Sequence, residues 1–136
     1  MNPADPILLV HTENAPAAIG PYSQAVCAQG LLFSSGQIAL RPDGRFLAED
    51  AAGQAKQIFA NLDAVLSAAG CTRNDVLKVQ VYLLDLEEFG AVNEVYEAWF
   101  GDHRPARVCV QVARLPKDAA IEVDLIARHS GTAESS

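Results

Sequence analysis

The chain has 136 residues, of which 50% are hydrophobic and 20% charged, and its formal net charge is −7 at pH 7. This length and apolar content predict one folded domain over residues 1–136, with flexible ends at about 1–6 and 130–136. An acidic chain whose ten Lys and Arg residues form no basic stripe is not expected to bind nucleic acid.

Residues 7–11 form a short apolar run that predicts a first strand. Residues 12–22 contain two prolines and a glycine and therefore predict a loop, but one apolar enough that we expect it to pack against other residues. Residues 24–29 and 31–35 predict two strands that turn at a Gln-Gly pair. Residues 37–40 then continue the strand.

Two residues in this part of the chain are candidates for a site. Tyr22 fits either the edge of the core, with its hydroxyl in water, or the wall of a pocket. Gly36 interrupts an apolar run, and a glycine within a strand indicates a bulge or the close approach of another group.

The clearest helix is predicted over Asp50–Ala69, because its apolar residues recur at intervals of three and four. Its first residue suits an N-cap, and Gly70 suits a left-handed stop. A strand over 76–84 and a second helix over 86–100 follow. Asn93 lies on the apolar face of that helix, where an amide must be hydrogen-bonded, either to a neighbouring loop or to a ligand.

Residues Arg104–Val112 predict a strand that carries three valines on one face and Arg107, Cys109 and Gln111 on the other. Arginine is rarely buried without a partner. Arg107 therefore extends into solvent, pairs with a carboxylate of this chain, or binds an anionic ligand.

A last strand is predicted over Ala120–Ile126, with Glu122 and Asp124 on the face opposite to its aliphatic residues. A turn-like connection links it to the preceding strand. We therefore expect the two strands to be neighbours, with Arg107 near an acidic side chain across a hairpin. A salt bridge on a solvated sheet face is the simplest interpretation of that arrangement.

The cysteines Cys27, Cys71 and Cys109 lie far apart, no CxxC is present, and the three histidines are scattered. This pattern disfavours a disulfide framework and a structural zinc site, so no metal is expected. Cys109 has neither an adjacent histidine nor a helix start to lower the pKa of its thiol, so a small buried apolar role is favoured.

The order of elements predicts an α+β domain in which a mixed β-sheet carries two helices on one face. The other face also bears apolar residues, for example within 31–40, and the chain offers no further element to cover it. Self-association is the economical solution. No apolar run approaches the length of about 18 residues that a membrane span needs, and the first residues lack the pattern of a secretory signal, so a cytoplasmic location is expected.

Five segments occur in an order that resembles one known family, the YjgF/Rid family of reactive-imine deaminases, in its RidA branch. The resemblance spans about Ile7 to Arg128. The segments are Glu13–Tyr22, Ser35–Gln37, Val92–Tyr96, Pro105–Val110 and Ala113–Val123.

The resemblance implies a chorismate-mutase-like fold and a cytosolic homotrimer with clefts between its subunits. It also implies hydrolysis of 2-imino acids and their enamine tautomers, such as 2-aminoacrylate, to 2-keto acids and ammonia. Such imines damage enzymes that use pyridoxal phosphate, and their removal is protective. The family's deaminases use no cofactor or metal, so none is expected.

The resemblance also assigns residues. Arg107 matches the arginine that holds the substrate carboxylate, a task for which its planar, permanently charged fork is suited. Glu122 matches the acid that positions the attacking water, and a carboxylate can accept a proton from that water. The remaining matches line the cleft, Cys109 mainly through its backbone: Tyr22, Ser35, Gly36, Asn93 and Cys109.

Val108 and Asp124 depart from the family pattern, which expects a small polar residue and a glutamate there. They leave the substrate preference open. Two other functions also stay open: a module that binds small carboxylates without turnover, and an endoribonuclease or translation inhibitor. The acidic charge and the absence of an acid–base histidine pair in the sequence disfavour the ribonuclease.

Overall fold

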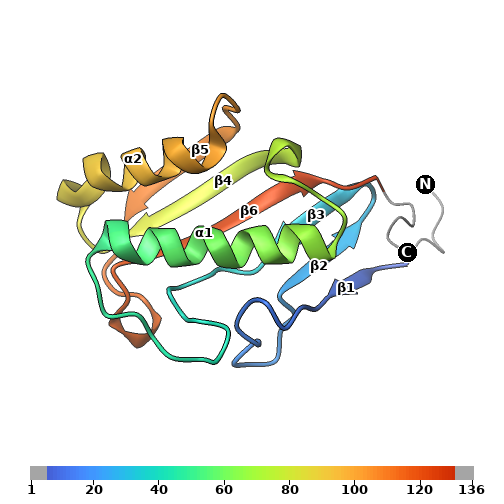
Figure 1. Ribbon diagram of the computed structural model, residues 1–136, viewed down its shortest axis with the longest axis horizontal. Coiled ribbons are helices and arrows are strands. Elements are labelled where there is room, and N and C mark those ends of the chain that lie inside the picture. The colour runs from blue at the N-terminus through green and yellow to red at the C-terminus, as the bar shows by residue number, and fades with distance from the viewer. Residues whose placement is uncertain (1–5, 131–136) are drawn as a thin grey trace.

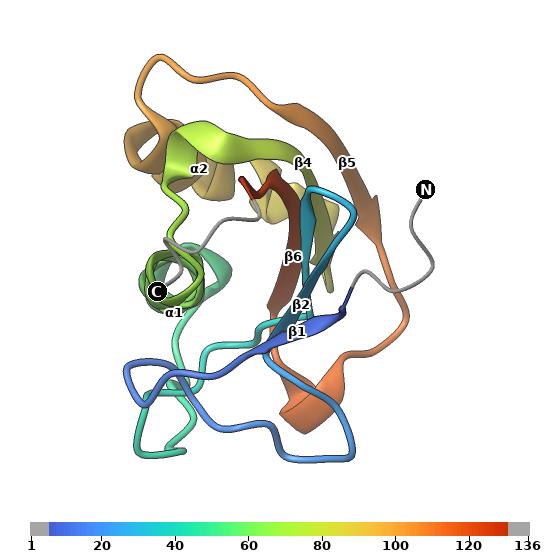
Figure 2. The ribbon, with the colours of Figure 1, turned by 90° about the vertical axis from the view of Figure 1, so that its right-hand side faces the viewer.

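The computed structural model describes residues 6–130, so the predicted flexible ends lie almost wholly outside the described residues. Figures 1 and 2 show a single mixed sheet with both helices on one of its faces, as predicted. The elements in chain order are β1 (Leu8–Val10), β2 (Ala25–Ala28), β3 (Leu31–Ser34), α1 (Ala51–Ala68), β4 (Val76–Leu83), α2 (Phe89–Phe100), β5 (Ala106–Gln111) and β6 (Ile121–Arg128).

The local signals of the sequence account for the turns and helix ends. Gln29 and Gly30 both have positive φ, at 57° and 78°, as the tight turn of the β2–β3 hairpin requires. At the start of α1, the Asp50 side chain accepts a hydrogen bond of 2.9 Å from the backbone N–H of Gly53. Gly70 follows the end of α1 with a φ of 78°, in the left-handed conformation that glycine favours.

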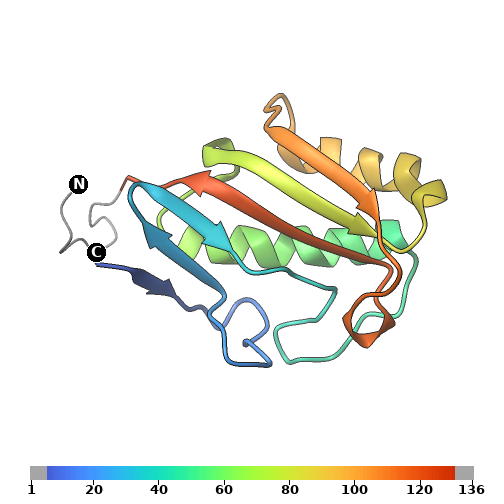
Figure 3. The same ribbon diagram turned by 180° about the vertical axis from the view of Figure 1, so that it is seen from behind.

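The order of strands in the sheet is β1-β2-β3-β6-β4-β5. Within residues 6–130 only β4 and β5 are parallel neighbours, because α2 carries the chain back between them, and the other neighbours are antiparallel. The prediction that the last two strands form a hairpin is wrong. Strand β4 lies between β5 and β6 (Figure 3). Helix α2 returns the chain to the outer side of β4, so the parallel strand β5 forms the edge of the sheet.

The register then decides which side chains share a face. Val79 of β4 stands opposite both Leu125 of β6 and Arg107 of β5, and it is fully buried beneath the helices. Tyr82 stands opposite Glu122. Because neighbours across strands share a face, Arg107 lies on the helix-covered face and Glu122 on the opposite face. The expected salt bridge between Arg107 and an acid of the last strand is therefore wrong.

The two faces of the sheet differ in whether helices cover them. The helix-covered face forms the core with α1, whose side chains Ile58, Phe59 and Leu62 are buried. The opposite face, which we call the open face, carries no α-helix formed by residues 6–130 (Figure 3). It exposes several large apolar residues, among them Leu9 at 71% and Phe33, Val108 and Val110 at between 40% and 42%.

The segment after β3 differs from its prediction. Residues 37–40 do not continue the strand, and only isolated bridges join Gln37 to Val123 and Leu40 to Phe46. The chain leaves β3 at Ser35 and Gly36, which turns the segment into one wall of a pocket. The glycine thus marks the end of regular pairing.

Candidate functional site

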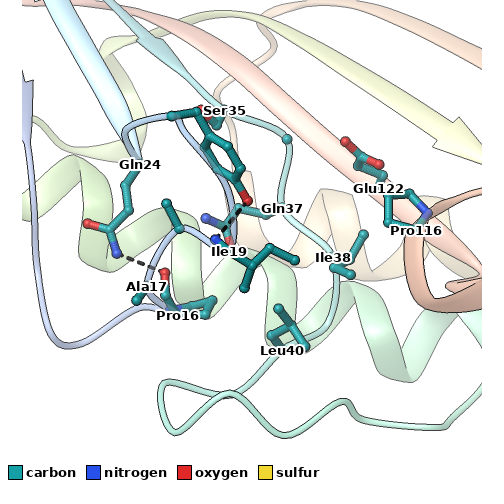
Figure 4. A pocket seen from close by; sticks show the side chains of 13 residues that line it. Pro16, Ala17, Ile19, Gln24, Ser35, Gln37, Ile38, Leu40, Pro116 and Glu122 are labelled. Atoms are coloured by element: carbon teal, nitrogen blue, oxygen red, sulfur yellow. Dashed lines mark hydrogen bonds between the residues drawn. The ribbon is translucent and has the colours of Figure 1, made fainter.

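A pocket of about 340 Å³ lies between the loop that precedes β2, the segment that follows β3, and strand β6. Figure 4 shows Glu122 and Pro116 on one side of it and Pro16, Ala17 and Gln24 on the other. Its walls are mostly apolar with a few polar groups, which is typical of a site for a small molecule. It is lined by Pro16, Ala17, Ala18, Ile19, Tyr22, Gln24, Ser35, Gly36, Gln37, Ile38, Leu40, Pro116 and Glu122.

A buried amide holds the loop that forms one wall. The Gln24 Oε1 atom accepts a hydrogen bond of 2.7 Å from the backbone N–H of Thr12. Its Nε2 donates to the carbonyl oxygens of Thr12 at 3.0 Å and Pro16 at 2.9 Å. Because Gln24 is 3% exposed, these bonds have no competition from water, and the loop is fixed to the start of β2.

Three of the predicted cleft residues, Tyr22, Ser35 and Gly36, line this pocket. Tyr22 is 48% exposed, and its hydroxyl oxygen accepts a hydrogen bond of 3.4 Å from the backbone N–H of Ile19. The Ser35 hydroxyl donates to the carbonyl oxygen of Ser23 at 2.6 Å. The serine side chain is thus engaged within the protein.

Gly36 and Glu122 are in close approach, which explains the glycine. A Cβ atom at position 36 would lie 1.9 Å from the Glu122 Oε2 atom. Reciprocal backbone hydrogen bonds between Gln37 and Val123, of 2.8 and 3.1 Å, hold the segment against β6. The Glu122 carboxylate consequently occupies the space that a side chain would fill.

Burial raises the pKa of Glu122, and the nearby charge of Asp124 raises it further. A carboxyl group in such surroundings binds a proton more readily than one in water. Glu122 is therefore better suited than an ordinary carboxylate to accept a proton and to return it during a reaction.

Arg107 belongs to a different part of the surface. Its Nη1 donates a hydrogen bond of 2.6 Å to the Oδ1 atom of Asn93, and its Cζ lies 5.3 Å and 4.7 Å from the ring centroids of Phe89 and Tyr96. Among the described residues no carboxylate forms an ion pair with it. The guanidinium is exposed and oriented, and its remaining donors can hold an anion.

The surroundings of Arg107 form a second, more open pocket of about 420 Å³. Tyr96 contributes a buried hydroxyl that has no hydrogen-bond partner among the described residues. Burial raises the pKa of Tyr96, so its phenol keeps its proton. This pocket is lined by Asn93, Tyr96, Glu97, Arg104, Pro105 and Arg107.

Cys109 lies on β5 on the same face as Arg107 and lines neither pocket. Burial raises the pKa of its thiol, and this outweighs the opposing effect of Arg107. The thiolate that a nucleophile requires is thus disfavoured, in agreement with the small apolar role that the sequence indicates.

The predicted site residues other than Cys109 therefore fall into two groups within one chain. Tyr22, Ser35, Gly36 and Glu122 line the first pocket, whereas Asn93 and Arg107 line the second, on the other face of the sheet. Sequence reasoning missed several residues of the first pocket. Polar residues beside apolar strand segments are the signal that could have found two of them, Gln24 and Gln37.

Across residues 6–130 no group of three or more His, Cys, Asp or Glu side chains is placed to hold a metal ion. No helix in the same range has the length and apolar character needed to cross a membrane.

Known proteins resemble this chain over nearly its whole length. The model of the Endoribonuclease L-PSP family matches residues 12–129. A RutC family protein of Pyrococcus horikoshii is 50% identical over 120 residues, which cover 88% of this chain and 95% of that protein. A protein of Salmonella typhimurium named 2-iminobutanoate/2-iminopropanoate deaminase is 48% identical over 121 residues, covering 87% and 94%.

A solved structure resembles this chain in fold as well as in sequence. The crystal structure of Escherichia coli TdcF with bound serine superposes with a TM-score of 0.84 at 43% identity, covering 90% of this chain and 98% of that one. The family model and the relatives thus agree in sequence and in fold. The protein therefore belongs to the Endoribonuclease L-PSP family, the YjgF/Rid family that its five sequence segments resemble.

Proposed function

We propose that the protein hydrolyses reactive 2-imino acids, such as 2-iminopropanoate and 2-iminobutanoate, to 2-keto acids and ammonia. The observation that carries this proposal is the 48% identity, over nearly the full length of both chains, to a protein named 2-iminobutanoate/2-iminopropanoate deaminase. Removal of such imines and of 2-aminoacrylate would protect enzymes that use pyridoxal phosphate.

In this proposal Arg107 binds the substrate carboxylate, and Asn93 keeps the guanidinium in place through their hydrogen bond. Glu122 accepts a proton from water as the water oxygen attacks the imine carbon. The resulting amino alcohol receives that proton on nitrogen and releases ammonia as the C–N bond breaks. Glu122 takes the hydroxyl proton as the C=O bond forms and passes it to ammonia, which leaves as ammonium. Water and iminium are thus converted to keto acid and ammonium without any other reactant.

The two catalytic groups cannot meet within one chain, because Arg107 and Glu122 occupy opposite faces of the sheet. We therefore propose that the site forms between subunits of a homotrimer, with Arg107 from one chain and Glu122 from the next. The exposed apolar residues of the open face support such an assembly, since a sheet face of this kind is stabilised by a partner.

The activity is tested by generating 2-iminopropanoate or 2-iminobutanoate in situ with an amino-acid oxidase, in the presence of semicarbazide. The protein should reduce semicarbazone formation, and Arg107→Ala should remove this effect while leaving the fold and the assembly intact. Arg45→Ala is the matched control, because Arg45 is exposed and pairs only with Asp43 in a turn. An Arg107→Ala variant with full activity would contradict the assignment.

The shared site is tested by mixing two inactive variants, Arg107→Ala and Glu122→Gln. If each site takes one residue from each chain, reassembled mixtures should regain part of the activity, because some interfaces then contain both intact residues. Light scattering should give three times the mass of the chain. A mixture that exchanges subunits but stays inactive would refute the shared site.

Two other functions have specific support. The TdcF structure contains bound serine, which favours a module that holds small carboxylates without turnover. The family's name instead suggests an endoribonuclease. No histidine lines either described pocket, and the net charge of −7 opposes RNA binding. Ligand binding without imine hydrolysis would favour the first alternative. RNA cleavage that survives repurification and is lost in Glu122→Gln would favour the second.

A further inference from the structure

A polar cluster lies beside Glu122 on the open face of the sheet. Glu122 and Asp124 are two residues apart on β6, so their side chains point to the same face. The β4 residues opposite them are Tyr82, across from Glu122, and Gln80, across from Asp124. Four polar side chains are thus grouped on the open face, which also carries Lys78 of β4 and the apolar residues Phe33, Val108 and Val110.

The hydrogen bonds within this cluster converge on Asp124. The Gln80 Nε2 atom donates to Asp124 Oδ1 at 2.6 Å, and the Tyr82 hydroxyl donates to Asp124 Oδ2 at 3.1 Å. Burial raises the pKa of Tyr82, and the Asp124 charge raises it further, so the phenol keeps the proton that it donates. A carboxylate that accepts hydrogen bonds on both oxygens is held in one orientation.

The Glu122 carboxylate has different surroundings. Among the described residues no group donates a hydrogen bond to it, and the groups packed against it at Gly36, Gln37 and Pro116 carry no charge. The ionisable groups that face it are Asp124 on its own strand and Tyr82 on β4. The fixed negative charge of Asp124 is thus the main charge that Glu122 meets within its own chain.

We infer that Asp124, held by Gln80 and Tyr82, is a positioning residue that keeps a fixed negative charge beside Glu122 and so makes Glu122 the proton carrier of the site. This inference depends on the proposed deamination, in which Glu122 takes a proton from water and returns it to nitrogen. Because a nearby like charge disfavours the ionised form of a carboxyl group, Asp124 makes Glu122 a stronger base.

The role of Asp124 is tested by following the carboxyl carbon of Glu122 by ¹³C NMR during a pH titration, with Glu122→Gln used to assign the signal. The titration midpoint should move to lower pH in Asp124→Asn. It should stay closer to that of the unchanged protein in Asp124→Glu, which restores the charge. Asp43→Asn serves as the matched control, because Asp43 lies in an exposed turn with Arg45. An unmoved midpoint in Asp124→Asn would overturn the inference.

The pH dependence of imine hydrolysis gives a second readout. Because Glu122 acts as a base in its ionised form, the acidic limb of the kcat profile should move to lower pH in Asp124→Asn, and kcat at neutral pH should fall more than KM changes. A lower kcat with an unmoved profile would indicate a purely structural role and refute the inference. Lack of imine hydrolysis in the unchanged protein would instead refute the proposed function, while the NMR titration still decides the effect of Asp124 on Glu122.

Discussion

Asn93 accepts a hydrogen bond of 2.6 Å from Arg107 and so fixes the direction of the guanidinium that we propose as the carboxylate anchor. The rings of Phe89 and Tyr96 lie close to the same guanidinium and keep it against α2. Orientation and retention of Arg107 are therefore provided by different neighbours, and they can be separated by mutation.

For Asn93→Ala we predict a loss of about tenfold in kcat/KM for imine hydrolysis, mainly through a higher KM. A hydrogen bond to a charged group contributes about 1.5–3 kcal/mol, and exposure lowers that figure toward the 1.4 kcal/mol that equals a factor of ten. Steady-state kinetics measures the change. Glu94→Ala, at an exposed neighbouring position on α2, should leave KM unchanged. Equal KM values for Asn93→Ala and the unchanged protein would argue against this role.

For Gly36→Ala we predict a fall in activity of about a hundredfold or more with little loss of stability. The new Cβ would lie 1.9 Å from Glu122 Oε2, so the glutamate side chain must leave its position, and misplacement of a catalytic group by about 1 Å can cost that much. Gly90→Ala is the control, because nothing lies within 4 Å of a Cβ built at that exposed position. Full activity in Gly36→Ala would show that Glu122 needs no fixed position.

For Glu122→Gln we predict higher stability at pH 7 together with loss of activity. Burial and Asp124 raise the pKa of Glu122 in the folded state. The folded protein therefore binds this proton more tightly than the unfolded chain, and the stability of the unchanged protein falls as the pH rises from the ordinary carboxyl range through the raised pKa.

The gain in unfolding free energy from Glu122→Gln should consequently grow over that pH range and disappear below it. Urea denaturation at fixed protein concentration, at several pH values, measures the difference. The exposed Glu94→Gln makes the same change of charge and should show no such trend. A gain that is independent of pH would mean that the ionisation of Glu122 is not its cause.

For Gln24→Leu we predict a loss of about 2–4 kcal/mol in unfolding free energy, because partly buried backbone groups of Thr12 and the buried carbonyl of Pro16 lose their partners. Activity should fall as well, since the loop forms a wall of the first pocket. Gln57→Leu, which loses one hydrogen bond to Asn61 on α1, should cost less. Chemical denaturation compares the two, and equal losses would contradict the special role of Gln24.

Local signals in the sequence predicted the elements well, because each depends on neighbours along the chain. Apolar spacing placed α1, the Asp50 cap and Gly70 marked its ends, and the Gln-Gly pair marked the β2–β3 turn. Gly36 was predicted to mark a bulge or a close approach, and Glu122 is the group that approaches it. The ends of α1 and the β2–β3 turn are set by backbone geometry at one or two residues.

The pairing of strands could not be predicted in the same way. The alternation of side chains along each strand showed that Arg107 and Glu122 point away from the face that carries the aliphatic residues of their own strands. It cannot show which of the two faces the helices cover. On β6 the aliphatic residues are buried and Glu122 faces outward, whereas on β5 the valines are exposed and Arg107 faces α2. The difference arises from the insertion of β4 between the two strands, which is a long-range property.

The central place of β6 has a consequence for how the protein forms during synthesis. Strand β6 pairs with both β3 and β4, and it is the last strand of the described chain to leave the ribosome. Until Ile121–Arg128 emerges, β3 and β4 each present an unpaired edge, and the buried side chains of α1 lack the middle of the sheet beneath them. Folding must then await nearly the whole chain, and a nascent chain stalled before Ile121 would be a substrate for chaperones or for aggregation.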